Sequence, residues 1–217
     1  MTKVKICGIT NLEDGINALN LGADYLGFNF YKNSPRFIEK SKAKKIIEKL
    51  SQKPKHSENV AVFVNENPGK IIDITNSCGI GLIQLSGDED ENFILNLKKA
   101  TNKKIIKAFR VRKNFPHTGK IFSGADYILL DSFKKGVYGG TGNPFNWSIA
   151  KRIDKKILFL SGGINAGNVR QAVYEASPFC VDVCSGVEKS PGRKDFSMMK
   201  DFINSVKNLN SKRVEIF

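Results

Sequence analysis

The sequence has little histidine, and that scarcity argues against a metal-dependent reaction. Two histidines occur among the 217 residues, His56 and His117, and both fall in segments that we expect to be loops. A metal-dependent epimerase would draw histidine and carboxylate ligands from the ends of strands. We therefore expect no metal site.

Long apolar runs are also missing. No stretch approaches the ~20 apolar residues that a membrane-spanning helix requires, and residues 1–8 carry charge without the apolar run of a signal peptide. We expect a soluble, cytoplasmic protein with no membrane partner. A chain of 24.1 kDa fits one α/β barrel and would be cramped as two domains, so we predict a single domain over residues 1–217.

Paired C-x-x-C motifs, which would close a structural zinc site, are absent from the sequence, and its four cysteines are scattered. Cys180 and Cys184 lie in an apolar run, and we expect both to be buried as small hydrophobic side chains. Cys7 differs, because it ends an apolar run and precedes a glycine. A thiol there is a candidate nucleophile or proton acceptor if nearby positive charge favours the thiolate.

Acidic residues are fewer than basic ones, which gives a formal net charge of +14. The lysines lie in stretches with helical character, at 40–49, 98–104 and 207–212, as expected for solvent-facing sides of helices. No aromatic RNA-binding signature, zinc finger or helix-turn-helix accompanies them. We expect no nucleic-acid partner, although a basic nucleic-acid-binding protein on a degenerate barrel stays open as an alternative. A positive field would also attract a small anion.

Short apolar runs alternate with helical stretches along the whole chain. The runs are too apolar for one-sided antiparallel strands and are typical of a parallel sheet covered by helices. About eight such units in a chain of this length predict the α/β class and a (β/α)8 barrel. The expected strands are residues 4–7, 25–28, 60–64, 81–85, 105–109, 127–130, 157–160 and 179–183.

The loops after the strands of such a barrel form one rim, so residues at strand ends are the candidates for function. Two strands end in small residues, at Gly162-Gly163 and at Ser185-Gly186. Exposed backbone N–H groups at two such ends, each before a helical stretch, are typical of a phosphate site. We therefore predict a phosphorylated small-molecule ligand.

The thiol of Cys7 and the carboxyl group of Asp131 stand at the ends of two expected strands. Lys5 shares the strand face of Cys7 because side chains alternate, and Lys107 is a second cation that could favour the thiolate. An acid among apolar residues has a raised proton affinity and can serve as a general acid.

Three further features lie on loops or strand ends. Arg36 follows the second strand and offers a planar guanidinium to a carboxylate. Gln84 ends the fourth strand and is a polar rim candidate. The glycine-rich stretch at residues 138–142 could fold over a ligand.

Taken together, these stretches resemble the phosphoribosylanthranilate isomerase family of tryptophan biosynthesis. The similarity covers nearly the whole chain. Its motifs are Val4–Thr10, Gly22–Asp24 with Gly27-Phe28, Ser34–Arg36, Val62–Asn65, Gln84-Leu85, Leu129–Asp131, Gly139–Gly142 with Phe145 and Trp147, Leu160–Gly163, and Asp182–Glu188 with Pro191-Gly192 and Lys194-Asp195.

The resemblance implies a cofactor-free Amadori rearrangement. Asp131 would be the general acid that protonates the ring oxygen, and Cys7 the general base that takes a proton from the second sugar carbon. Arg36 would hold the anthranilate carboxylate, and Gln84 and Asp182 would contact or orient the substrate. The phosphate would lie against Gly162, Gly163, Ser185 and Gly186.

The sequence departs from the usual pattern of this family at two positions. Ser86 stands where histidine is common, and Cys184 where serine is frequent. Neither is a proton-transfer position. Another phosphosugar isomerase or epimerase on the same barrel is the alternative among enzymes, and the sequence leaves open whether the protein is a monomer or a homodimer.

Overall fold

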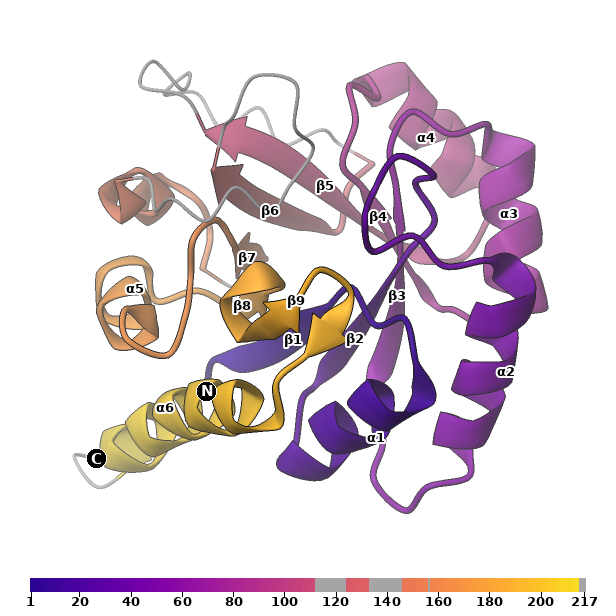
Figure 1. Cartoon of the computed structure of the whole chain (residues 1–217). Helices are drawn as coiled ribbons and strands as arrows, with labels where there is room; N and C mark the ends of the chain where they lie inside the picture. Colours follow the sequence, from indigo (N-terminus) through magenta and orange to yellow (C-terminus); the bar gives the residue numbers. More distant parts are fainter. Residues whose placement is uncertain (112–123, 133–145, 156, 215–217) are drawn as a thin grey trace.

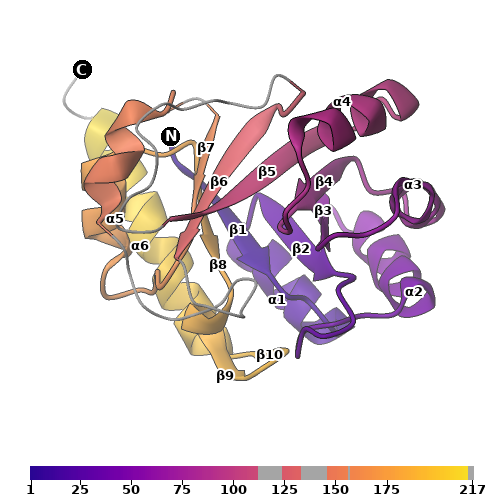
Figure 2. The same cartoon turned by 90° about the horizontal axis from the view of Figure 1, so that it is seen from above.

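A computed structural model describes residues 1–111, 124–132, 146–155 and 157–214. Eight parallel strands close into a barrel in the order in which they occur along the chain (Figures 1 and 2). The eight strands predicted from the sequence are confirmed. They are β1 (Lys3–Cys7), β2 (Tyr25–Asn29), β3 (Glu58–Phe63), β4 (Leu82–Leu85), β5 (Lys104–Val111), β6 (Tyr127–Ser132), β7 (Leu158–Leu160) and β8 (Cys180–Val183).

Helices surround the barrel, as Figure 2 shows from above. Those of the described residues are α1 (Leu12–Leu21), α2 (Lys40–Ser51), α3 (Pro68–Ser77), α4 (Glu91–Ala100), α5 (Val169–Ala176), α6 (Phe196–Val214) and the 3-10 helices η1 (Trp147–Arg152) and η2 (Ser185–Val187). A short antiparallel hairpin, β9 (Glu188–Ser190) and β10 (Arg193–Lys194), follows η2. No described helix is long and apolar enough to cross a membrane.

Local sequence signals explain where the helices begin and end. The side chain of Asn11 accepts a hydrogen bond from the backbone N–H of Asp14 and caps α1, and Gly22 ends that helix at φ 91°. Asn67 caps α3 in the same way, with Pro68 in the first helical turn. In α2 the lysines face solvent while Ala43, Ile46, Ile47 and Leu50 are buried. The excess lysines of this segment are therefore on a solvent face, as predicted.

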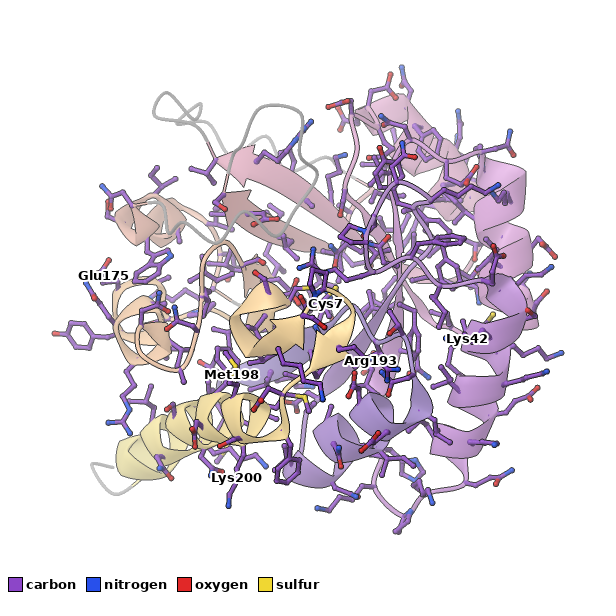
Figure 3. All side chains as sticks on the ribbon, viewed as in Figure 1. Cys7, Lys42, Glu175, Arg193, Met198 and Lys200 are labelled. Atoms are coloured by element: carbon purple, nitrogen blue, oxygen red, sulfur yellow. The ribbon has the colours of Figure 1, made fainter. Side chains whose placement is uncertain are left out.

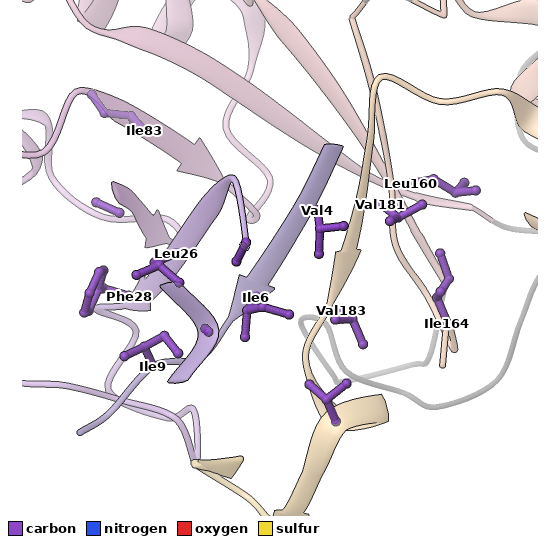
Figure 4. Close-up of a cluster of buried hydrophobic side chains, with 14 of the residues drawn as sticks. Val4, Ile6, Ile9, Leu26, Phe28, Ile83, Leu160, Ile164, Val181 and Val183 are labelled. Carbon is purple, nitrogen blue, oxygen red and sulfur yellow. The ribbon is translucent and has the colours of Figure 1, made fainter. Parts of the chain in front are cut away.

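Side-chain alternation on the strands divides the interior into two layers. Val4 and Ile6 of β1, with Val181 and Val183 of β8, face the helices and join the main hydrophobic core (Figure 4). A smaller cluster fills the barrel itself and consists of Tyr25, Val60, Leu82, Ile106, Ala108, Leu129, Phe159 and Cys180. Lys5 and Cys7 of β1 and Asp182 of β8 also point into the barrel, above this cluster, and they carry the polar groups.

Candidate active site

The nine residues predicted as site residues come together at the carboxyl ends of the strands. An open pocket of about 670 Å³ is lined by Cys7, Arg36, Gln84, Asp131 and Asp182. A smaller pocket of about 250 Å³ shares Asp131 and Asp182 with it and is lined by Gly162, Gly163, Ser185 and Gly186. In Figure 3 the labelled Cys7 lies near the middle of the molecule.

A buried cation forms the floor of the pocket. Lys5 is 0% exposed, and its Nζ donates to both carboxylate oxygens of Asp182 at 3.0 Å and to Oε1 of Gln84 at 2.9 Å. Burial by itself lowers the pKa of Lys5, but Asp182 and Cys7 outweigh it, and the pKa is raised. Lys5 therefore stays charged, and it fixes the positions of Asp182 and Gln84.

Cys7 ends β1 two residues beyond Lys5 and is 9% exposed. A hydrogen bond from the Cys184 thiol lowers the pKa of Cys7 to about 7, burial opposes the shift, and Lys5 supports it. The thiolate is thus well populated near neutral pH. Gly27 on β2 makes room for this sulfur, because a Cβ at that position would lie 2.7 Å from Sγ.

Asp131 sits near the end of β6 and is 9% exposed. Burial raises the pKa of its carboxyl group to about 6, against the hydrogen bond that the backbone N–H of Ser132 donates to Oδ1 at 2.7 Å. A carboxyl group with this pKa keeps its proton for a useful fraction of the time near neutrality.

Arg36 is held at the rim by a carboxylate that sequence reasoning did not single out. Its Nη2 lies 2.7 Å from Oε2 of Glu188, whose Oε1 accepts from Lys194 Nζ at 2.9 Å. Burial raises the pKa of Glu188, but the hydrogen bonds from Arg36 and the charge of Lys194 lower it overall. The signal available in the sequence was the position of Glu188, just past the Ser185-Gly186 strand end.

Close packing shapes the two glycine-bearing loops at the smaller pocket. Gly162 has φ 85°, and a Cβ there would lie 2.5 Å from the backbone nitrogen of Ser132. A Cβ on Gly186 would collide with the carbonyl oxygen of Ile164. Among the described residues, the N–H groups of Gly162 and Gly163, which lie outside helices and strands, donate no backbone hydrogen bond. These groups are available to an anion.

Two predictions made from the sequence are wrong. Cys184 is not a buried apolar filler: it is partly exposed and lines both pockets, although Cys180 is fully buried as expected. Lys107 does not serve Cys7, because its Nζ lies 2.6 Å from Oε2 of Glu89 in a separate buried pair. The alternation of side chains on β5 sends Lys107 outward, whereas Ala108 faces the barrel.

Two more polar residues of the larger pocket are Ser86, which the sequence analysis noted only as a departure from the family pattern, and Arg110, which it did not name. Ser86 accepts a hydrogen bond from Nε2 of Gln84 at 3.0 Å, and Arg110 pairs with Asp88. The glycine-rich stretch 138–142 and His117 lie outside the described residues.

Fold and pocket together define a (β/α)8 barrel with a polar site of enzyme type at the carboxyl ends of its strands. The family model for N-(5'-phosphoribosyl)anthranilate isomerase matches residues 4–205. The chain belongs to this isomerase family.

Relatives and solved structures agree with the family match. The N-(5'-phosphoribosyl)anthranilate isomerase of Aquifex aeolicus is 46% identical over 209 residues, which cover 95% of this chain and 99% of the relative. The crystal structure of the Thermus thermophilus enzyme superposes with a TM-score of 0.84 at 28% identity, over 96% of this chain and 100% of the other. A phosphoribosylanthranilate isomerase in complex with reduced 1-(o-carboxyphenylamino)-1-deoxyribulose 5-phosphate gives a TM-score of 0.77 at 36% identity, with 96% and 100% of the chains covered.

Proposed function

We propose that this protein converts N-(5'-phosphoribosyl)anthranilate to 1-(2-carboxyphenylamino)-1-deoxyribulose 5-phosphate, an Amadori rearrangement in tryptophan biosynthesis. The observation that carries the proposal is the meeting of Cys7 and Asp131 in one pocket with pKa values shifted in opposite directions, to about 7 and about 6. One group then donates a proton and the other accepts one within the same narrow pH range.

Asp131 acts as the general acid in this proposal. Its protonated carboxyl group donates to the furanose ring oxygen as the bond from that oxygen to the anomeric carbon breaks, and the nitrogen lone pair of the substrate forms an iminium. Burial supports the role, because it raises the pKa of Asp131.

Cys7 acts as the general base. Its thiolate removes the proton from the second sugar carbon, the electrons of the C–H bond neutralise the iminium, and the resulting enolamine tautomerises to the ketone. The cation of Lys5 and the hydrogen bond from Cys184 support the thiolate form. In this account Lys5, Asp182 and Gln84 are positioning residues beneath the reacting carbons.

Arg36 binds the anthranilate carboxylate at the other end of the substrate. Glu188 engages Nε and Nη2 of Arg36, and we assign Nη1 to the substrate. The phosphate lies against Gly162, Gly163, Ser185 and Gly186, whose loops line the smaller pocket. The ligand bound by the solved relative carries both a carboxyphenyl and a phosphate group, which matches a pocket with two anion sites.

The decisive experiment follows anthranilate fluorescence after phosphoribosylanthranilate is mixed with the purified protein. We expect a loss of fluorescence whose rate is proportional to protein concentration. A second phosphosugar, ribose 5-phosphate, serves as the specificity control. Turnover of that sugar without turnover of phosphoribosylanthranilate would contradict the proposal. We further propose that residues 1–217 form one domain and that the protein acts in the cytoplasm with the rest of its pathway.

A further inference from the structure

Two cysteines lie side by side at the carboxyl ends of two neighbouring strands. β1 and β8 are parallel, with Ile6 opposite Val183, so the next residues are Cys7, which ends β1, and Cys184, which directly follows β8. Neighbouring strands lie about 5 Å apart, and a disulfide accepts that Cα separation.

Both cysteine side chains point into the barrel mouth. Lys5 and Asp182, two residues earlier on each strand, form an ion pair inside the barrel, and alternation brings Cys7 and Cys184 to the same inner side. Both line the larger pocket. The Cys184 thiol donates to Oε1 of Glu188 at 3.8 Å, and its proximity to Cys7 lowers the pKa of Cys7. A Cβ on Gly8 would lie 3.0 Å from Sγ of Cys184, so this sulfur packs against the end of β1. The two thiols therefore face the same open pocket from adjacent chain segments.

The charges around the two sulfurs give them different reactivities. Lys194 Nζ and the carboxylate oxygen Oε1 of Glu188 each lie 3.8 Å from Sγ of Cys184, whereas the cation of Lys5 lowers the pKa of Cys7. The hydrogen bond between the thiols lowers the pKa of Cys7, whereas that bond and burial raise the pKa of Cys184. Cys7 is therefore the attacking sulfur and Cys184 the resolving one.

We propose that Cys7 and Cys184 are an oxidation site for hydrogen peroxide and form a reversible disulfide across the pocket. The Cys7 thiolate attacks a peroxide oxygen, the O–O bond breaks, and Cys7 sulfenic acid and hydroxide result. Cys184 gives up its proton and attacks the sulfenic sulfur, which expels hydroxide. Overall, two thiols are oxidised by two electrons and one peroxide is reduced to two waters.

The disulfide between Cys7 and Cys184 would inactivate the pocket reversibly. A sulfur held in a disulfide cannot accept a proton, so oxidation blocks the proposed base. Because the bridge protects Cys7 from further oxidation, reduction by a thiol restores it. The inference goes beyond the proposed function, and its chemical readout needs no isomerase substrate.

Peptide mapping after peroxide treatment tests the proposal. Trypsin releases Cys7 in residues 6–32, whereas Cys180 and Cys184 share residues 171–189. We expect wild-type protein to lose two of its four thiols, to become lighter by two hydrogen atoms, and to yield these two peptides cross-linked within one chain. Dithiothreitol should restore both thiols and, in proportion to the cross-linked fraction, the activity.

Two variants assign the bridge. Cys180→Ala removes the other cysteine of the shared peptide from the buried barrel interior, and we expect the cross-link to persist. Cys184→Ser should abolish the cross-link, so that Cys7 is oxidised past the sulfenic acid by a second peroxide to the sulfinic acid, a gain of two oxygen atoms that dithiothreitol does not reverse. Circular dichroism checks that each variant folds, and Cys184→Ala replaces Cys184→Ser if it does not. The proposal is overturned if wild-type Cys7 gains oxygen while Cys184 remains alkylatable, if all four thiols survive, or if the bridge uses Cys180 or a second chain.

Discussion

The ammonium group of Lys5 lies 3.0 Å from both carboxylate oxygens of Asp182, in the floor of the pocket and two residues before Cys7 on the same strand. A buried pair of this kind adds little net stability but leaves a costly unpaired charge when one partner is removed. The pair matters here because it fixes the position of a positive charge beneath the thiol of Cys7.

Replacing the cation tests that role. Lys5→Met leaves Asp182 buried without its partner, and we expect the free energy of unfolding to fall by about 3–5 kcal/mol. The charge of Lys5 lowers the pKa of Cys7, although less than the hydrogen bond from Cys184 does. In Lys5→Met the pKa of Cys7 should therefore rise above about 7. Ultraviolet absorbance of the thiolate against pH measures this shift. The control is Lys3→Met at the half-buried start of the same strand, and an unchanged titration of Cys7 in Lys5→Met would contradict the role.

Gly27 provides a test of how tightly Cys7 is held. A Cβ at this position would lie 2.7 Å from Sγ and 3.0 Å from Cα of Cys7, so Gly27→Ala must displace the thiol. Misplacement of a reacting group by about 1 Å costs about 10²-fold in rate, and we expect kcat to fall by that order. Gly81→Ala is the matched control, because no atom lies within 4 Å of its Cβ position. Equal rates for the two variants would show that the position of Cys7 is not critical.

Arg36 should act on binding. Arg36→Ala removes the group assigned to the anthranilate carboxylate, while Glu188 keeps its bond to Lys194. A lost charge-assisted hydrogen bond costs about 1.5–3 kcal/mol, so we expect KM to rise about 10- to 100-fold with a smaller change in kcat. Steady-state kinetics in parallel with Arg193→Ala, an exposed arginine of β10, measures this. A large fall in kcat at unchanged KM would remove the assignment.

The pH dependence of kcat/KM follows from the two shifted groups. Asp131 must be protonated, so activity falls as pH rises above about 6, and Cys7 must be a thiolate, so activity falls as pH drops below about 7. We expect a bell centred between these values, with about one molecule in twenty correctly protonated at the maximum if the groups titrate independently. A value of kcat/KM that stays constant from pH 5 to about 8 would contradict the assignment of Asp131 and Cys7 as acid and base.

The sequence predicted the strands and the clustering of the site for a physical reason. Eight apolar runs have few ways to bury both faces, and once they close into a parallel barrel, their carboxyl ends must share one rim. Cys7 and Asp131 therefore met in one pocket although they are far apart in the chain.

The contacts between side chains were beyond such reasoning. That Cys184 adjoins Cys7 depends on the register in which β8 closes on β1, and no periodicity encodes that register. The prediction for Lys107 was wrong because its side chain points outward from β5 and forms an ion pair with the buried Glu89. Glu188 was missed because its role arises from Arg36, in the loop after β2, and from Lys194 on β10, the strand that pairs with its own.

The central claim is that Cys7 and Asp131 carry the two proton transfers, and single-turnover rates of Cys7→Ser and Asp131→Asn with phosphoribosylanthranilate test it most directly. Both substitutions keep the approximate size and polarity of the original side chains, so the fold should persist by circular dichroism. We predict that each lowers the rate by about 10²- to 10⁴-fold. Near wild-type rates in either folded variant would contradict the account.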